Sequence, residues 1–547
     1  MSKTFLLISF TCLLLSSCTN KKQFASKKIF RYNESKGIAS LDPAFARNQS
    51  VMWPINQLFN GLVQIDDSLN VKPCIAKRWK ISDGNKKYTF YLRQDVYFHN
   101  QNIFPGNKGR KVIAVDFEYS FNRLIDPTTA SPGAWIFNII NKNKKGTNNG
   151  FKAENDSVFE IYLKNPFPAF LGLLTMQYCS VVPKEAIKNY GNDFRNHPVG
   201  TGPFKFKKWI EGEKLVLVKN ENYFEKDKQG KSLPYIDAVA ITFIADKQSE
   251  FLEFIKGKID FIHDFNSSFK DELITRHGKL NPKYYGKIKL LVSPYLNTEY
   301  LGILIDTSLN IVRKSPLRFR EVRQAINLGF DRVKMMDYLR NNIGYPATSG
   351  ILPMGMPSFS DKEVPGYVYN PDSAAKLLTK AGFPGGKRLD EITLTTTSDY
   401  LDLCEFIQQQ LSQLGIRLKI EVATGATFRD MMANSKLIFF RNSWIADYPD
   451  AENYLALFYS KNFSPNGPNY SHFKSKEYDR LYERSMNEPN DNIRYNYYRQ
   501  MQRLLIAESV IIPLYYDVAV RFINNRVNNL GINSLNLLKL KQVIINN

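Results

Sequence analysis

Cysteine and histidine are scarce in this 547-residue chain, which holds five of each. Cys74, Cys179 and Cys404 are too widely spaced to form a disulfide framework, although one pair among them could be bridged. No histidine stands near another histidine or a cysteine at metal-ligand spacing. This argues against a dedicated zinc or iron site, and we predict no cofactor.

Motifs for catalysis are also missing. The sequence has no Gly-x-Ser-x-Gly elbow and no Walker A loop, because Gly385-Gly386-Lys387 is followed by Arg388 and lacks the leading glycine. A secreted hydrolase is disfavoured, since no nucleophile and base can be paired. We therefore predict a binding protein and not an enzyme.

Long apolar runs are limited to residues 5–15, which are too few to span a bilayer as a helix. Lys3 precedes this run and Leu15-Ser16-Ser17-Cys18 ends it, so the parts of a secretory signal are present. A cysteine directly after the small residues resembles a bacterial lipoprotein signal. We expect a signal peptide at 1–17, acylation of Cys18 and a flexible tether at 18–28. The alternative is an ordinary secretory signal that happens to contain a cysteine.

Acidic residues are few relative to basic ones: 52 Asp and Glu stand against 74 Lys and Arg, a formal charge of +22. Such an excess can indicate nucleic-acid binding. Here the charges are spread along the chain, and an export signal argues against a nucleic-acid partner. The composition favours a basic surface beside anionic lipid.

The length predicts about two to four domains. Up to about residue 177 the patterns are those of an α+β unit, and from about residue 300 strands alternate with helices. The latter order is typical of a parallel sheet with crossover helices. Strands are expected at 88–93, 204–209, 214–219, 392–397, 416–422, 436–440 and 511–516. Helices are expected at 56–61, with a strand directly after it, and at 114–124, 372–380, 401–414, 427–434, 477–487 and 492–508.

The segment after the strand expected at 436–440 carries the candidate site. Arg441, Trp444 and Asp447 follow at three-residue spacing where the chain would leave the sheet, and ligands bind at such ends of α/β sheets. Asp447 could pair with an ammonium group, Arg441 could hold a carboxylate, and Trp444 could cover an apolar side chain. The alternative is a surface loop in which Asp447 only caps the helix from residue 451 onward.

Six sets of short motifs follow one another along nearly all of the mature chain: SLDP at 40–43, LFNGL at 58–62, VDF at 115–117 with DP at 126–127, PVGTGPF at 198–204, LRFREVRQAI at 317–326 and WIADYPD at 444–450. In this order they resemble the extracytoplasmic peptide-binding lipoproteins of bacterial ABC importers, the oligopeptide/dipeptide-binding family (family 5 solute-binding proteins).

The resemblance implies an α/β fold with an α+β insertion. This is the two-lobed periplasmic-binding-protein-like architecture (type II, three-segment) with a ligand cleft between lobes. The expected segments are a discontinuous lobe I at 29–59, 178–300 and 516–547, an inserted domain II at 60–177, and an α/β lobe III at 301–515.

The resemblance also implies residue roles. Asp447 matches the aspartate that pairs with the peptide N-terminus, Arg441 an arginine near the bound backbone or C-terminus, and Trp444 a pocket-lining tryptophan. Ser443, between them, is expected to contact the ligand too. Two positions depart from the family pattern. Ile445 replaces a cysteine found in some relatives, which excludes a disulfide there, and Gly133 stands where an aromatic residue is common, so Trp135 is a candidate for that contact.

The function implied is capture of di- or oligopeptides and their delivery to a membrane permease with its ATPase. We expect a monomer outside the cytoplasm, anchored by lipid to a bacterial membrane, with no nucleic-acid partner. Two alternatives stay open: the same fold binding a nickel chelate, haem or oligosaccharide, and a receptor that signals the presence of peptide.

The lipid anchor is directly testable. The mature protein should partition into the detergent phase with lipid on Cys18, and Cys18→Ala should leave it soluble or unprocessed, because stable anchoring needs more than one acyl chain. Phase separation and mass spectrometry of the N-terminal peptide check this. Wild-type protein found only in the aqueous phase, with its signal removed elsewhere, would contradict the prediction.

Overall fold

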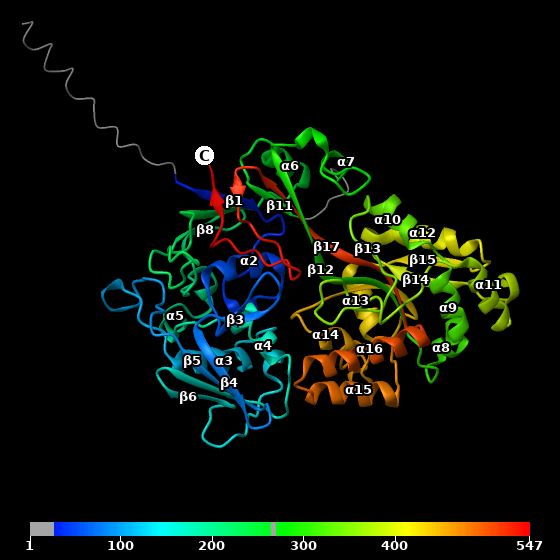
Figure 1. Ribbon diagram of the computed structural model, residues 1–547, viewed down its shortest axis with the longest axis horizontal. Helices are drawn as coiled ribbons and strands as arrows, with labels where there is room; N and C mark the ends of the chain where they lie inside the picture. Colours follow the sequence, from blue (N-terminus) through cyan, green and yellow to red (C-terminus); the bar gives the residue numbers. More distant parts are fainter. Residues whose placement is uncertain (1–26, 264–269, 547) are drawn as a thin grey trace, which may run out of the picture.

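The computed structural model describes residues 27–263 and 270–546. The predicted signal segment and the tether up to residue 26 lie outside this part of the chain. Two bodies lie side by side, and a pair of long strands connects them (Figure 1). Among the described residues, no helix combines the length and the apolar character needed to span a bilayer.

One mixed sheet runs through both bodies. Over the described ranges it has eleven strands, in the order β15-β14-β16-β12-β17-β11-β1-β10-β9-β8, with β13 paired beside β17. Its strands are β1 (Ile29–Asn33), β8 (Phe204–Ile210), β9 (Lys214–Lys219), β10 (Ala238–Thr242), β11 (Phe261–His263), β12 (Ile288–Ile303), β13 (Tyr345–Pro346), β14 (Ile392–Thr396), β15 (Leu418–Val422), β16 (Phe439–Ile445) and β17 (Ile511–Asn524).

Strands β12 and β17 belong to both lobes. The first half of β12 pairs with the second half of β17 in lobe I, and Thr298 to Gly302 pair with the beginning of β17 in lobe III. The register shifts between Pro294 and Thr298, where proline offers no N–H for the ladder. The predicted lobe boundaries after residues 300 and 515 fall inside these two strands.

Domain II is an antiparallel sheet covered by one helix. Its strands are ordered β4 (Ala76–Ser82), β5 (Lys87–Leu92), β7 (Val158–Tyr162) and β6 (Phe151–Asn155), and helix α3 (Ala114–Ile125) packs on them. The ring of Phe121 lies 5.5 Å from that of Phe151 and 5.7 Å from that of Phe159, so aromatic packing fills this core.

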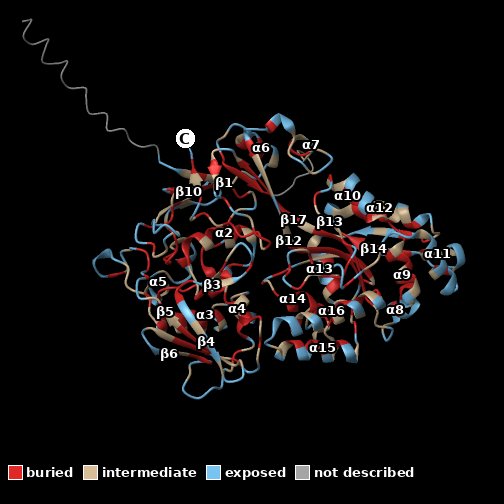
Figure 2. Ribbon diagram, viewed as in Figure 1, coloured by how far each residue is buried: buried red, intermediate tan, exposed pale blue. Residues whose placement is uncertain are grey.

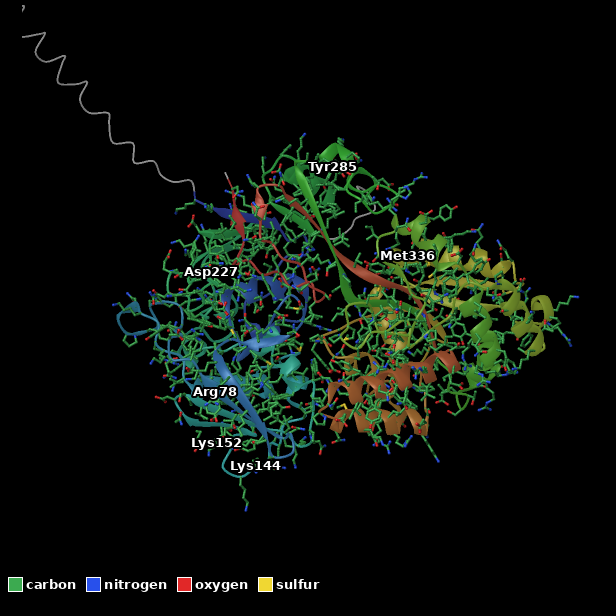
Figure 3. All side chains as sticks on the ribbon, in the orientation of Figure 1. Arg78, Lys144, Lys152, Asp227, Tyr285 and Met336 are labelled. Atoms are coloured by element: carbon green, nitrogen blue, oxygen red, sulfur yellow. The ribbon has the colours of Figure 1, made fainter. Side chains whose placement is uncertain are left out.

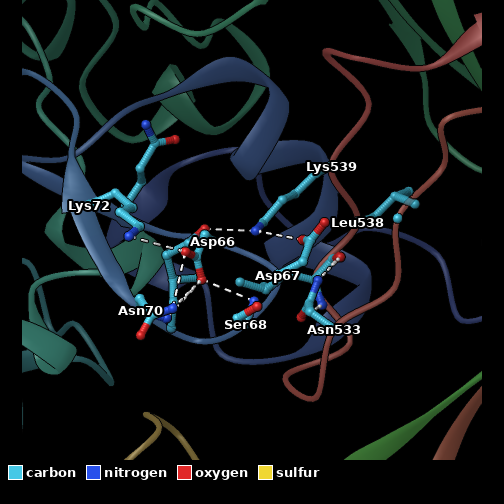
Figure 4. A network of polar contacts seen from close by, with 12 residues as sticks. Asp66, Asp67, Ser68, Asn70, Lys72, Asn533, Leu538 and Lys539 are labelled. Atoms are coloured by element: carbon cyan, nitrogen blue, oxygen red, sulfur yellow. Dashed lines mark hydrogen bonds and ion pairs between the residues drawn. The ribbon is translucent and has the colours of Figure 1, made fainter. Parts of the chain in front are cut away.

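Polar contacts connect domain II to lobe I. The Arg110 guanidinium binds Asp116 at the start of α3 and also Glu185 of helix α5 (Lys184–Tyr190), each at 2.7 Å. The C-terminal segment reaches the hairpin of β2 (Val63–Ile65) and β3 (Val71–Pro73). There Lys539 pairs with Asp67 at 2.9 Å, as Figure 4 shows. Apolar packing connects them as well, because the buried apolar residues of domain II and lobe I form one continuous hydrophobic core.

In lobe III the three strands β14, β15 and β16 are parallel as predicted, while β16 pairs antiparallel with β12. Helices α12 (Leu401–Ser412) and α13 (Gly425–Ala433) lie in the connections. The sheet is buried while the outer faces of helices such as α11 and α15 are exposed (Figure 2). The other helices of this lobe are α8 (Asn310–Lys314), α9 (Arg320–Leu328), α10 (Arg332–Arg340), α11 (Pro371–Lys380), α14 (Glu452–Leu455), α15 (Lys476–Asn487) and α16 (Asp491–Glu508).

Three predicted elements were wrong in their bounds. The strand expected at 511–516 is β17, which continues to Asn524 because β11 and the first half of β12 pair with its second half. The helix expected at 56–61 is α2 (Gln49–Leu58), which begins earlier because the Asn48 side chain accepts the N–H of Val51 and caps it. The strand expected at 436–440 is β16, which continues to Ile445 because β12 supplies a partner strand along that length. Cys74, Cys179 and Cys404 are buried and free.

The PVGTGPF motif packs against the end of α2. The N–H of Gly202 donates to the Leu58 carbonyl at 2.9 Å, and a Cβ atom at Gly200 would lie 2.0 Å from the same oxygen. The two glycines are therefore required by a close approach of two backbone segments.

Replacing Gly200 should show the strength of this constraint. Gly200→Ala should lower the free energy of unfolding by about 1–3 kcal/mol, as overpacking does. Gly425→Ala is the control, because the nearest atom there is a flexible arginine nitrogen at 3.4 Å and alanine favours a helix. Urea denaturation measures both, and equal stabilities for the two variants would refute the packing argument.

Candidate ligand-binding site

A cavity of about 670 Å³ lies between the lobes. Its size falls within the roughly 300–1,000 Å³ typical of small-ligand sites. Lobe I supplies the first turn of α2 and Tyr178, and domain II supplies Pro132, Trp135 and residues 175–177. Tyr295 of the crossing strand β12 and residues 445–447 of lobe III form the opposite part of the wall. Leu535 and Leu537 of the C-terminal segment complete it.

Hydrogen bonds fix the lobe III part of the wall. The N–H of Ala446 donates to the carbonyl of Leu296 at 2.8 Å, and Tyr454 of α14 donates to the carbonyls of Leu296 and Trp444. The Asn453 amide oxygen accepts the Trp444 indole N–H at 2.8 Å and the backbone N–H of Asp447 at 3.3 Å. This segment is therefore held against the point where the strands cross between lobes.

Asp447 faces the cavity without a basic partner. Among the described residues its carboxylate accepts one hydrogen bond, from the Asn453 amide at 3.3 Å, and forms no ion pair. Its side chain is exposed to the cavity, but the surrounding protein desolvates the carboxyl group in part and raises its pKa above the usual value.

The alternative role of Asp447 as a helix cap was wrong. Asp450 instead accepts the N–H of Glu452 at the start of α14, at 3.0 Å. Asp450 also pairs with Arg494 at 3.1 Å, so its charge is satisfied inside lobe III.

Arg441 lies within β16 and not after it, and its side chain is buried away from the cavity wall. Its guanidinium forms an ion pair with Glu299 of β12 and lies over the ring of Tyr400. The amide of Asn297 joins Glu299 to Asp517, and Asp517 pairs with Arg340 at 3.0 Å. Burial raises the pKa of Glu299, and the nearby Arg441 opposes that shift.

The other predicted site residues are divided between the cavity and its support. Trp135 lines the cavity and is 39% exposed. Trp444 is half-buried and braces the wall through Asn453, while Ser443 is half-buried opposite Glu299 in the ladder between β16 and β12. Neither Ser443 nor Trp444 is part of the cavity wall. Cys18 lies outside the described residues.

These features allow comparison with known proteins. Residues 70–466 match the model of the bacterial extracellular solute-binding proteins, family 5 middle region. This chain belongs to that family. The match confirms the resemblance carried by the ordered motifs.

Individual members of family 5 match along nearly the whole chain. The periplasmic oligopeptide-binding protein OppA of Salmonella typhimurium is 28% identical over 522 residues, 92% of this chain and 89% of the relative. The dipeptide-binding protein DppE of Bacillus subtilis is 25% identical over 95% and 93% of the two chains. The structure of HbpA2 from Haemophilus parasuis, 23% identical, matches with a TM-score of 0.80 over 95% and 100% of the chains, which shows the shared fold.

Some cavity residues were missed by sequence reasoning. The first is Tyr178, which lines the cavity. Its ring lies so close to Gly133 that a Cβ atom on that glycine would be 2.3 Å from it. The glycine departs from the family pattern because this tyrosine occupies the adjoining space. Arg47 is the second, and it follows the SLDP motif with no distinctive sequence pattern of its own.

Two roles are open to Arg441, binding of a ligand carboxylate and neutralisation of the buried Glu299, and they predict different results. If Arg441 balances Glu299, Arg441→Met should lower the free energy of unfolding by about 3–5 kcal/mol, because a buried carboxylate loses its partner. Adding Glu299→Gln should recover part of that loss. Arg429→Met, at an exposed position, is the control. Unchanged stability with lost ligand binding would instead assign Arg441 to the ligand.

Proposed function

We propose that this protein captures peptides in the cavity between its lobes and delivers them to an ABC permease and its ATPase. The observation that carries this proposal is the Asp447 carboxylate, which faces the cavity with no cation beside it among the described residues. OppA and DppE are named for binding oligopeptides and dipeptides, which supports the same class of ligand.

The free amino terminus of a peptide fits this carboxylate. An ammonium group that enters a closing cleft loses its water, and a carboxylate in contact offsets that loss. The rest of the wall is largely apolar and aromatic, with Met52, Trp135, Met176 and Tyr178 among its members. Such a surface can cover side chains of varied shape, as a carrier of many peptides requires.

Capture requires the lobes to move together. Lobe I and lobe III are joined by the strands β12 and β17, whose shared ladder is irregular between Pro294 and Thr298. Bending at this irregular stretch would bring Asp447 toward the wall supplied by lobe I and domain II, a hinge closure of the kind that binding proteins share. A ligand that touches both walls favours the closed state over the open one.

The remaining parts of the proposal concern location and assembly. A lipid on Cys18 would hold the protein at the outer surface of a bacterial membrane, near a permease. Because one molecule supplies every wall of the cavity, a monomer suffices for capture.

Asp447→Ala should weaken binding of peptides with a free amino terminus by about 2–5 kcal/mol, the range for truncating one partner of a buried charge pair. An N-acetylated peptide should bind wild type poorly and lose little more on the variant, because the two groups in contact do not act independently. Calorimetric titration of both peptides against both proteins measures the coupling free energy between the peptide ammonium group and the Asp447 carboxylate. Asp361→Ala, at an exposed aspartate outside the cavity, is the control.

The affinity should also depend on pH with a defined sign. As pH falls through the raised pKa of Asp447, the carboxylate gains a proton and loses its attraction for ammonium. Binding to wild type should therefore begin to weaken at a higher pH than for an ordinary aspartate, and the Asp447→Ala variant should lack this transition. Equal ratios of free to acetylated affinity in both proteins would refute the role of Asp447.

A further inference from the structure

The cavity wall holds a second charged side chain, the guanidinium of Arg47. Of the described residues that line the cavity, Arg47 and Asp447 are the two with charged side chains. Arg47 is exposed to the cavity, and within residues 27–263 and 270–546 it makes no ion pair and no side-chain hydrogen bond. A lobe I cation and a lobe III carboxylate thus border one space, and neither neutralises the other.

Tyr178 lies within electrostatic range of both charges. Burial raises the pKa of its hydroxyl to about 12, with Asp447 adding to the rise and Arg47 opposing it. Since Tyr178 itself lines the cavity, the two charges act on the same part of the wall. The cavity is therefore polarised, positive toward lobe I and negative toward lobe III.

The position of Arg47 in the chain strengthens the positive side. Arg47 directly precedes Asn48, the N-cap of the ten-residue helix α2, and Asn48 and Gln49 also line the cavity. The first turn of α2 contains no acidic residue, so its N-terminal partial charge is not offset there. In addition, the Gln49 amide nitrogen has no hydrogen-bond partner among the described groups.

We propose that Arg47, supported by the first turn of α2, is a subsite for a carboxylate of the ligand. It would bind either the C-terminus of a short peptide or an acidic side chain, while Asp447 binds the amino terminus. This inference rests on the proposed peptide-binding function and adds the preferred ligand class. A guanidinium suits a carboxylate because it can donate two parallel hydrogen bonds to it.

The geometry explains why this role falls to Arg47 and not to Arg441. The Arg441 guanidinium already pairs with Glu299, so recruiting it for a ligand would leave that buried carboxylate uncompensated. The Arg47 guanidinium makes no such contact with the described chain. A zwitterion that spans from Arg47 to Asp447 would also touch both lobes and so favour closure.

The test compares matched ligands on matched variants of the full chain. Alanine peptides of two to five residues, each with a free amino terminus, are titrated as free acids and as C-terminal amides. A second set of amides carries glutamate in place of one alanine. The proteins are wild type, Arg47→Gln, Arg47→Lys and Arg78→Gln, the last a control at an exposed arginine of β4 outside the cavity (Figure 3).

Wild type and Arg78→Gln should prefer the carboxylate-bearing peptide over its neutral match by about 10- to 100-fold. Arg47→Gln should abolish that preference, and Arg47→Lys should restore part of it. If Arg47→Gln loses the preference for free acids over amides, the subsite binds the peptide C-terminus. If it loses the preference for glutamate-containing amides over alanine amides, the subsite binds an acidic side chain. Ratios that survive Arg47→Gln would overturn this inference alone. Failure of wild type to bind any of the peptides would overturn peptide capture and the inference together.

Discussion

The two strands that pass through both lobes are the constraint on which the rest of this structure depends. The strands β12 and β17 pair in lobe I and again in lobe III, so the same two strands belong to the sheet of both lobes. The buried pair of Glu299 and Arg441 lies on β12 and its neighbour β16, beside this crossing, and the Leu296 carbonyl there holds the segment with Asp447. The segment with Asp447 is thus held beside the proposed hinge, so a ligand that contacts this segment would act close to the point of bending.

Charge separation gives the cavity its chemistry. Two buried carboxylates of lobe III are paired with arginines nearby, Asp450 with Arg494 and Glu299 with Arg441. Asp447 and Arg47 are not balanced by the described chain. Holding an unpaired charge in a partly desolvated space costs free energy, and a ligand of opposite charge recovers it. We regard this as the physical basis of the proposed preference for zwitterions.

Much of the fold could be predicted from local patterns. The alternation of β9 and the apolar periodicity of α3, α12 and α16 gave elements close to those observed, since burial of one face imposes these periods on the sequence. The helix α2 was misplaced because its local cap at Asn48 was not recognised, whereas the strand errors occurred where a partner distant in the sequence sets the length. β16 extends to Ile445 because β12 pairs with it, and no pattern within residues 436–445 reveals that partner.

The sequence by itself determined the family, through ordered motifs, and placed Asp447 and Trp135 among the candidates that line the cavity. Only the tertiary structure decided which charges remain available to a ligand. Arg441 and Arg47 are chemically identical, but one is buried against Glu299 and the other borders the cavity opposite Asp447. Availability depends on what long-range packing brings beside each guanidinium, and that is set by contacts between residues far apart in the chain.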